Sequence, residues 1–435
     1  MSGIRISRRR FVGGAAATVA GGFFVNPQPA RPSQSANERL NIAAVGATNR
    51  AAANISAVAS QNIVAIADVD GELLEKGSQN YPAARKYRDF RQMLEKEGDK
   101  LEAVVVSTPD HTHAPAAAMA LRMKKHVYCE KPLTHTVYEA RVLAQLAREN
   151  NLVTQMGTQI HAGDNYRRVV ELIEQKAIGT VQEVHVWVPA IWTGAKFEPA
   201  EKPPHLDWDL WLGPAPDRPY CKGIHPFYWR RFWEYGSGAL GDFGCHYLDL
   251  VHWALKLRHP VRVTAKGPPV DEVSCPAWLI VEYEYPARGD LPPVKVTWYD
   301  GGKQPEILST LRDGEGRLLE WRAGQLFIGT EGMLISEYSR HMLLPVEKFR
   351  DYKRPDPYIP ASIGHHAEWL EAIRSGGTTT CNFDYSGALT ETVLLGTVAY
   401  RAGESLEWDA EAFRIKNSEK AQQLLHKEYR KGWVL

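Results

Sequence analysis

The stretch from Leu40 to Asp70 constrains the fold of this chain more than any other feature. It reads LNIAAVGATNRAAANISAVASQNIVAIADVD: an apolar run, a glycine turn, a helix-like stretch and a second apolar run that ends at Asp68. This β-α-β order is typical of a dinucleotide-binding unit. Asp68 follows Gly46 by 22 positions, close to the spacing of about 20 at which an acidic residue meets the ribose hydroxyls. The carboxylate favours NAD over NADP, because it would repel a 2′-phosphate.

The glycine fingerprint of this unit is incomplete. Gly46 is present, but Thr48 stands at the second glycine position and Ala51 at the third, where alanine is permitted. The Thr48 side chain crowds the approach of a pyrophosphate, although its hydroxyl could donate a hydrogen bond to it. Taken alone, the motif leaves open an α/β domain that binds no nucleotide.

Two loops follow further apolar runs. The pattern predicts strands at Glu102–Ser107 and His126–Cys129, with a helix at Ala114–Met123 between them. The carboxyl ends of parallel strands are where such sheets bind ligands. The loops STPDHTH (Ser107–His113) and EKPL (Glu130–Leu133) are therefore predicted to line the site.

Lys131 is the predicted acid/base group. At the end of a strand and beside an oxidised nicotinamide, desolvation and like charge favour its neutral amine. Such an amine exchanges a proton with a substrate hydroxyl near neutral pH. Pro132 fixes the backbone directly after it, at a position where a cis peptide is accessible. The alternative is a surface Glu-Lys pair that opens the next helix.

A second cluster of chemistry-bearing residues lies in GSGALGDFGCHYLDLVHWAL, residues 236–255. If a helix begins at Asp242, then Asp242 and His246 share one face, and the carboxylate can fix the tautomer of the imidazole. The alternative is a capping aspartate beside a core histidine. Lys131, Asp242 and His246 together suit the removal of a proton from an alcohol as hydride leaves its carbon.

Over about residues 38–410 the chain resembles the Gfo/Idh/MocA family, the group of glucose-fructose oxidoreductase and inositol dehydrogenase. The resemblance rests on Asp68, STPDHTH, E-K-P at Glu130–Pro132 and D-x-x-x-H from Asp242 to His246. The stretch LDWDLWLGPAP, residues 206–216, resembles an exported subgroup of the family. The resemblance implies that Lys131, Asp242 and His246 are catalytic. The predicted cofactor contacts are Gly46, Thr48, Asn49, Arg50, Asp68, Thr108, Pro109, His113, Glu130 and Gln159.

The family also implies an architecture: a Rossmann domain, here residues 37–160, followed by an α/β domain with a large open antiparallel sheet, here residues 161–410, and a C-terminal tail at 411–435. One face of that sheet would form a homodimer or homotetramer. Alternation in the sequence agrees with strands in the second domain. These are predicted at Val181–Ile191, Val261–Lys266, Trp278–Tyr285, Val294–Tyr299 and Gln325–Ile328, with helices at Ile363–Arg374 and Tyr385–Arg401 that complete the second domain.

Residues 1–36 have the layout of a signal peptide. Arg8–Arg10 precede a weakly apolar run, Phe11–Val25, and SRRRFV resembles the twin-arginine consensus of an export route for folded proteins. The prediction is a periplasmic or otherwise exported protein, with cleavage near residues 30–36 and no membrane span afterwards. The alternative is an uncleaved anchor or a disordered basic tail.

Charge and cysteine content exclude several partners. The 52 basic and 51 acidic side chains leave a formal net charge of +1, which argues against nucleic acid or a charged membrane as partner. Five scattered cysteines form no CxxC pair, so neither a disulfide framework nor a cysteine-based zinc site is predicted.

The region from Trp187 to Trp233 is dense in aromatic residues, histidine and proline. Aromatic faces stack on sugar rings, and interleaved donors meet sugar hydroxyls, so a small carbohydrate is the predicted substrate. His225, Tyr228 and Arg230 are the predicted substrate contacts. The alternative is a proline-rich loop whose aromatic residues only cover the core.

Export bears on the mechanism, because no pool of NAD exchanges with the protein outside the cytosol. The cofactor would stay bound, in either a sugar oxidoreductase or an NAD-dependent glycoside hydrolase that oxidises, eliminates and reduces again. A third class is a metal hydrolase built from His111, His113, His246 and His252, or a sugar-binding protein without chemistry. No metal is predicted, because His111 and His113 lie on the nucleotide loop and the sequence places no third ligand.

Overall fold

The computed structural model describes residues 39–435. The predicted signal peptide, residues 1–36, lies outside the described residues, so the twin-arginine leader stays a prediction. Within the described part of the chain, no helix combines the length and the apolar character needed to cross a bilayer.

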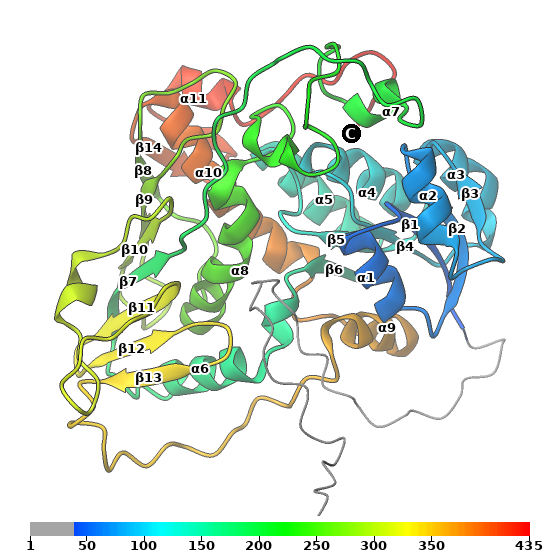
Figure 1. The fold of residues 1–435 in the computed structure, drawn as a ribbon. Helices are drawn as coiled ribbons and strands as arrows, with labels where there is room; N and C mark the ends of the chain where they lie inside the picture. Colours follow the sequence, from blue (N-terminus) through cyan, green and yellow to red (C-terminus); the bar gives the residue numbers. More distant parts are fainter. Residues whose placement is uncertain (1–38) are drawn as a thin grey trace, which may run out of the picture. The chain divides into compact units, whose positions relative to one another are not determined.

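The first half of the structure is a six-stranded sheet in the order β3-β2-β1-β4-β5-β6, with every neighbouring pair parallel (Figure 1). The strand order reverses between β1 and β4, which is the arrangement of a Rossmann sheet and puts a ligand crevice at the carboxyl ends. The strands are β1 (Asn41–Val45), β2 (Asn62–Ala67), β3 (Arg85–Tyr87), β4 (Ala103–Val106), β5 (His126–Glu130) and β6 (Thr154–Gly157). The helices among them are α1 (Arg50–Ala57), α2 (Gly71–Ser78), α3 (Phe90–Glu97), α4 (His113–Arg122) and α5 (Val137–Glu149). The predicted Rossmann half is confirmed.

The second half contains a nine-stranded sheet in the order β13-β12-β11-β7-β10-β9-β8-β14-β15. Its strands pair antiparallel except β7 with β10, which are parallel. The strands are β7 (Val181–Trp187), β8 (Arg262–Lys266), β9 (Ile280–Tyr285), β10 (Val294–Tyr299), β11 (Gly324–Gly329), β12 (Met333–Ser336), β13 (His341–Leu344), β14 (Leu406–Asp409) and β15 (Arg414–Ile415). The predicted α/β domain with a mostly antiparallel sheet is confirmed. β7 ends earlier than predicted, since Pro189 has no N–H to continue the ladder.

Long helices connect the two halves. α6 (Asp164–Glu174) and α8 (Gly238–Leu255) pack against each other, and α10 (Phe383–Ala402) packs against α8, β8 and α5 of the first half. α9 (His365–Ser375) was predicted to complete the second domain, but its Trp369 is buried in one cluster with Ile42 and Tyr128 of the first sheet. A Rossmann sheet needs helices on both faces, and α9 covers part of one of them.

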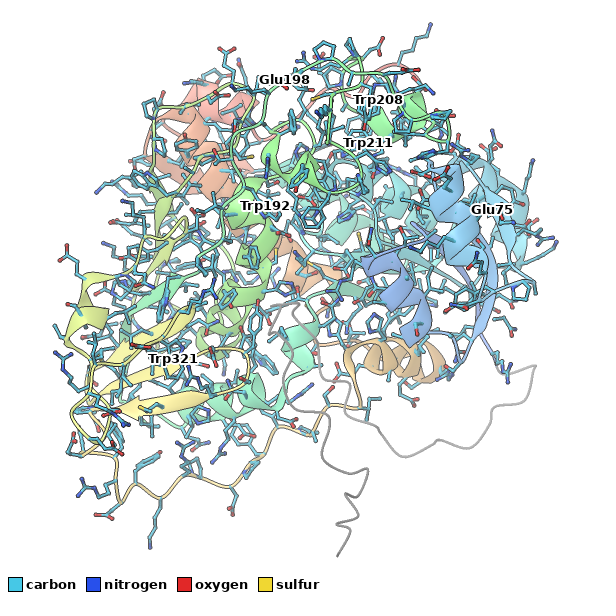
Figure 2. The ribbon with its side chains drawn as sticks, viewed as in Figure 1. Glu75, Trp192, Glu198, Trp208, Trp211 and Trp321 are labelled. Carbon is cyan, nitrogen blue, oxygen red and sulfur yellow. The ribbon has the colours of Figure 1, made fainter. Side chains whose placement is uncertain are left out.

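The segment between β7 and α8 builds a small core of its own. Trp208 and Trp211 of α7 (Trp208–Leu212), labelled in Figure 2, stack with ring centroids 4.7 Å apart. The same segment docks on the first sheet: Gly71 N donates to His205 O at 2.9 Å, and Asp207 N donates to Val69 O at 3.0 Å. The aromatic-rich region therefore lies against the carboxyl end of β2.

Candidate active site

The turn at Gly46 has the shape that a dinucleotide needs. Gly46 has a φ of +100°, and a Cβ there would lie 2.5 Å from Ser107 O, so no other residue fits without movement. α1 begins at Arg50, and Asn49 before it makes no side-chain cap. Ala51 N of the first turn donates to Thr48 O at 3.0 Å, and no side-chain cap occupies the other N–H groups at this helix end, where an anion such as a pyrophosphate is favoured. The tight turn at Gly46 is therefore kept although Thr48 replaces the second glycine.

Asp68 follows β2 and lies beside this turn. Its two carboxylate oxygens accept hydrogen bonds from Ala47 N and Asp70 N, both at 3.0 Å. Burial raises the pKa of Asp68 to about 6, against the effect of these two donors. The carboxylate lies at the strand end where the sequence predicts a contact with ribose hydroxyls.

His113 joins the two predicted loops. Its Nδ1 lies 2.8 Å from Pro132 O and its Nε2 lies 2.8 Å from Thr108 O. Burial lowers the pKa of His113 to about 4, so the neutral ring donates to one of these carbonyls. Thr112 Oγ1 adds a hydrogen bond to Thr108 Oγ1 at 2.8 Å. The structure brings Thr108, Pro109 and His113 together, and the His113 ring links the 107–113 loop to the 130–133 loop.

Glu130, at the end of β5, and Gln159, just after β6, are hydrogen-bonded to each other. Glu130 Oε1 accepts from Gln159 Nε2 and from Asn54 Nδ2, both at 2.8 Å. Burial raises the pKa of Glu130, against the effect of the charge of Arg50 and of these donors. Gly157 leaves room for this carboxylate, since a Cβ there would lie 2.6 Å from the Glu130 carboxyl carbon. Asn54, which sequence reasoning missed, links the Glu130 loop to α1.

Lys131 and Asp242 form an ion pair at the carboxyl end of β5. Lys131 Nζ donates to Asp242 Oδ1 at 2.7 Å and to its backbone oxygen at 2.5 Å, and each side chain is 14% exposed. Arg230 Nε lies 3.4 Å from the same Oδ1, and Trp192 Nε1 donates to Oδ2 at 2.8 Å. Burial alone would raise the pKa of Asp242, but the charges of Lys131 and Arg230 outweigh it and hold the pKa well below its ordinary value.

The geometry around His246 differs from the prediction. α8 begins at Gly238, four residues before Asp242. The described hydrogen bonds of the Asp242 carboxylate go to Lys131, Arg230 and Trp192, so the predicted contact that would fix the imidazole tautomer is wrong. Two cations and an indole N–H compete for that carboxylate. His246 Nδ1 is buried without a partner, and burial together with the charge of Lys131 holds the pKa of His246 well below its ordinary value.

Asp110 is a second acidic group near this cluster that sequence reasoning missed. It is 5% exposed, and burial raises its pKa to about 8, against the effect of the charge of Arg230. Asp242, Lys131 and Lys427 also act on it electrostatically. The available signal was its place in STPDHTH, an acidic residue inside a loop predicted to be buried against the cofactor.

The three predicted substrate contacts lie in different surroundings. Arg230 joins the Lys131–Asp242 cluster, with its guanidinium 4.2 Å from the centroid of the Trp229 ring. His225 Nε2 instead contacts Asp70 Oδ2 at 3.0 Å, and the exposed ring of Tyr228 lies beneath Arg231. Trp192, which was not singled out, belongs to the site with Arg230.

The histidines of the metal-hydrolase alternative do not converge. His111 Nε2 contacts Trp211 O at 2.9 Å, and His252 Nε2 contacts Tyr285 OH at 3.0 Å. Within residues 39–435, the group with converging ligand atoms is His161, Asp249 and Cys381, all buried. His161 Nδ1 already bonds to Asp249 at 2.9 Å.

A parallel Rossmann sheet, a glycine turn and a strand-end acid define the class of NAD-binding α/β proteins. Residues 40–158 match the family model described as oxidoreductase family, NAD-binding Rossmann fold. Residues 178–291 match the model described as oxidoreductase family, C-terminal alpha/beta domain. The chain belongs to the Gfo/Idh/MocA oxidoreductase family.

Curated relatives match over part of their length. Levoglucosan dehydrogenase of Pseudarthrobacter phenanthrenivorans is 25% identical over 43% of this chain and 41% of its own. Myo-inositol 2-dehydrogenase of Thermotoga maritima is 24% identical over 31% of this chain and 39% of its own. The chain thus spans about two fifths of the length of these relatives.

Solved structures share the fold over most of the chain. Levoglucosan dehydrogenase in complex with NADH and levoglucosan has a TM-score of 0.56 at 18% identity and covers 85% of this chain and 99% of its own. GenD2 from gentamicin A biosynthesis, in complex with NAD, has a TM-score of 0.58 at 21% identity and covers 88% of this chain and 100% of its own.

Proposed function

We propose that this protein is an NAD-dependent oxidoreductase that exchanges hydride with a CH–OH carbon of a sugar or sugar derivative. The observation that carries the proposal is the Lys131–Asp242 ion pair, 2.7 Å long, at the same edge of the parallel sheet as Gly46 and Asp68. This edge is where Rossmann sheets hold a dinucleotide. An amine at this edge would serve as the acid/base partner of a hydroxyl.

In the proposed mechanism, the Lys131 ammonium of the ion pair gives a proton to the substrate oxygen during reduction, and in the oxidation direction the neutral amine takes the proton of the substrate hydroxyl. Asp242 orients the amine through its backbone oxygen and Oδ1, and it stabilises the ammonium that forms. His246 is neutral, so its ring is able to accept or donate a hydrogen bond at a neighbouring hydroxyl. The nicotinamide, when bound, supplies the hydride acceptor.

Three observations support NAD and a sugar. Asp68 lies beside the Gly46 turn and accepts from Ala47 N, and we expect its carboxylate to repel the 2′-phosphate of NADP. Trp192, Phe227 and Trp229 surround the Arg230 guanidinium, and aromatic rings with a cation between them suit a polyhydroxylated ring. The relatives named above include dehydrogenases of levoglucosan and myo-inositol.

The test begins with the purified mature protein. Unfolding it should release NAD or NADH, and sugars should be oxidised or reduced by the untreated protein. Aryl glycosides should be screened in parallel, because a free sugar formed without net change in cofactor absorbance would favour the NAD-dependent glycoside hydrolase. A folded protein that holds no dinucleotide and is indifferent to added dinucleotide would contradict both.

We also propose that the leader directs export of the folded protein, with its cofactor tightly bound, into the periplasm. Substitution of Arg8 and Arg9 by lysine should keep the protein in the cytosolic fraction.

We further propose a homodimer or homotetramer formed through the open face of the second sheet. Light scattering of the mature protein should return the mass of two or four chains, and a monomer would contradict this.

A further inference from the structure

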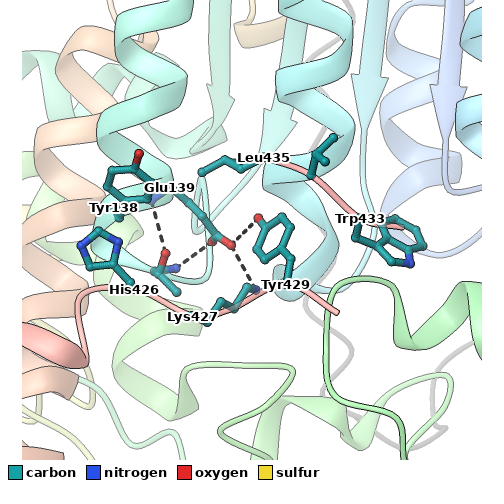
Figure 3. A pocket seen from close by; sticks show the side chains of 9 residues that line it. Tyr138, Glu139, His426, Lys427, Tyr429, Trp433 and Leu435 are labelled. Carbon is teal, nitrogen blue, oxygen red and sulfur yellow. Dashed lines mark hydrogen bonds and ion pairs between the residues drawn. The ribbon is translucent and has the colours of Figure 1, made fainter. Parts of the chain in front are cut away.

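The C-terminal residues 424–435 run back across the first half of the molecule, outside both regions that match the family models (Figure 3). Tyr138 N of α5 donates to Leu425 O at 3.1 Å. Arg430 Nε donates to Gly213 O at 2.6 Å, and the guanidinium of Arg91 lies 4.2 Å from the centroid of the Trp433 ring. The predicted tail is thus attached at several points, and with α5 it lines a cavity of about 260 Å³.

Lys427 is the residue of this segment that reaches the active-site loops. Its Nζ lies 3.1 Å from Glu139 Oε1, 3.1 Å from His135 Nδ1 and 3.3 Å from His111 O. An ammonium has three donors and no acceptor. The three acceptors, from the 107–113 loop and from the segment 135–139, therefore match its full donor capacity.

The contact with His135 sets the tautomer of that ring. His135 Nδ1 faces an ammonium, so it must accept, and Nε2 then carries the proton and donates to Gly236 O at 3.3 Å. Burial, with the charge of Lys427, keeps the pKa of His135 well below its ordinary value, so the ring stays neutral. Lys427 thereby controls a hydrogen bond to the residues that lead into α8.

Two of the three acceptors belong to loops of the proposed site, and the third belongs to the helix that follows the Lys131 loop. His111 lies in the loop 107–113 that His113 joins to the Lys131 loop. His135 follows Lys131 by four residues, and Gly236 precedes α8, which carries Asp242 and His246. Glu139 holds the first turn of α5 through a capping box with Thr136. Glu139 Oε1 also accepts from Tyr429 OH of the tail at 2.7 Å (Figure 3).

We infer that Lys427 is a positioning residue for the reaction: its ammonium holds the Lys131 loop, the 107–113 loop and the start of α8 in register. This inference rests on the proposed function, since the register matters only if Lys131 and α8 act on one substrate. The described hydrogen bonds and ion pairs of Lys427 do not include Gly46 or Asp68, so we expect a larger effect on turnover than on the binding of the nucleotide. Misplacement of a reacting group by about 1 Å costs up to about a hundredfold in rate.

The test compares Lys427→Met, Lys427→Arg and the matched control Lys420→Met in the full mature protein. Lys420 lies in the same C-terminal region, where its Nζ donates to Ala402 O at 2.8 Å and contacts none of the three loops. For Lys427→Met we expect kcat, per folded molecule counted by circular dichroism, to fall about tenfold or more. Lys427→Arg should recover part of this loss, and Lys420→Met should match the wild type. NADH affinity, from fluorescence titration, should change less than about threefold in each.

Several outcomes would overturn the inference. The inference would be wrong if folded Lys427→Met had the wild-type kcat, or if Lys427→Arg had no higher kcat than Lys427→Met. It would also be wrong if Lys420→Met lost as much kcat as Lys427→Met. Each of these outcomes would leave the proposed function intact. If Lys427→Met does not fold, Lys427→Gln, which keeps a donor, should show a smaller loss of kcat in the same direction, and no loss would contradict us. A wild-type protein that neither binds dinucleotide nor turns over a sugar would overturn the proposed function first and this inference with it.

Discussion

The two ends of the candidate site each contain a buried carboxylate, and the two are held in opposite ways. Asp68, at the predicted ribose end, accepts from the backbone N–H groups of Ala47 and Asp70, and burial raises its pKa to about 6. Asp242, at the proposed catalytic end, accepts from Lys131, Arg230 and Trp192, and the two cations hold its pKa well below its ordinary value. One carboxyl is close to gaining a proton at neutral pH, and the other stays ionised.

The difference follows from where the partners come from in the chain. The donors to Asp68 belong to a single β-α-β unit, so that end is complete within residues 41–70. The donors to Asp242 come from positions 12, 50 and 111 residues away. Charge compensation at the catalytic end therefore depends on the packing of three segments, and it should be the more sensitive end to single substitutions.

Removing Lys131 is the strongest test of this comparison. Lys131→Met should lower kcat by about 10²–10⁴-fold, because the proton acceptor is lost, while NADH should still bind through the ribose end. Initial rates and NADH fluorescence titration measure the two quantities. The control is Lys125→Met, on the residue before β5. If Lys131→Met keeps the wild-type turnover, Lys131 is not the proton acceptor and the proposed catalytic role of the Lys131–Asp242 pair is wrong.

Asp110→Asn tests whether the carboxyl group of Asp110, which lies near the Lys131–Asp242 pair, is protonated at neutral pH. Burial raises the pKa of Asp110 to about 8, although the charges of Arg230 and Lys131 act to lower it. The protonated carboxyl group therefore stabilises the folded state, and this contribution to the free energy of unfolding is lost as the pH rises through 8. Between pH 6 and pH 8.5 the free energy of unfolding of the wild type should fall by about 1–3 kcal/mol more than that of Asp110→Asn. Urea unfolding at both pH values measures this. Parallel pH dependence would show that Asp110 does not titrate with a pKa of about 8 in the folded protein.

Asp68→Asn tests the ribose end. A hydrogen bond from a hydroxyl to a charged group is worth about 1.5 kcal/mol or more, so the Kd for NADH should rise about tenfold. The ratio of the Kd for NADPH to the Kd for NADH should become smaller, because asparagine does not repel a 2′-phosphate. In the wild type the affinity for NADH should fall as the pH drops below about 6, where Asp68 gains its proton. The variant should lack this pH dependence. Unchanged affinity and preference would mean that Asp68 does not contact the ribose.

Trp192→Phe makes the smallest change. It removes the indole N–H that lies 2.8 Å from Asp242 Oδ2 and keeps most of the ring, while Lys131 and Arg230 still hold the carboxylate. We expect kcat to fall about threefold, in line with one hydrogen bond of about 0.5–1 kcal/mol. Trp408→Phe, on β14, serves as the control. A loss as large as that of Lys131→Met would show that the two cations do not suffice to orient Asp242.

The same contrast explains what could be read from the sequence. β1, β2, β4 and β5 were predicted closely because buried parallel strands appear as continuous apolar runs, and Lys131 stood out because a charge ends such a run. The start of α8 was missed, since Gly238 and Gly241 weaken the helix signal.

Other features depend on tertiary packing that no local pattern reveals. The contacts of Asp242 with Arg230 and Trp192, the burial of Asp110 and the position of α9 against the first sheet all join residues that are distant in the chain. His225 was expected at the substrate but contacts Asp70, because the segment around it docks on the end of β2. An aromatic-rich loop predicts a covering element, but not which surface it covers.

The pairing of β14 with β8 has a consequence for the order in which the chain is completed during synthesis. β8, at residues 262–266, has one side open until residues 406–409 emerge from the ribosome to pair with it. A chain halted before residue 406 would expose that strand edge, and exposed edges template aggregation. Residues 406–435 therefore close one sheet and then reach the loops of the other, so both halves depend on this segment.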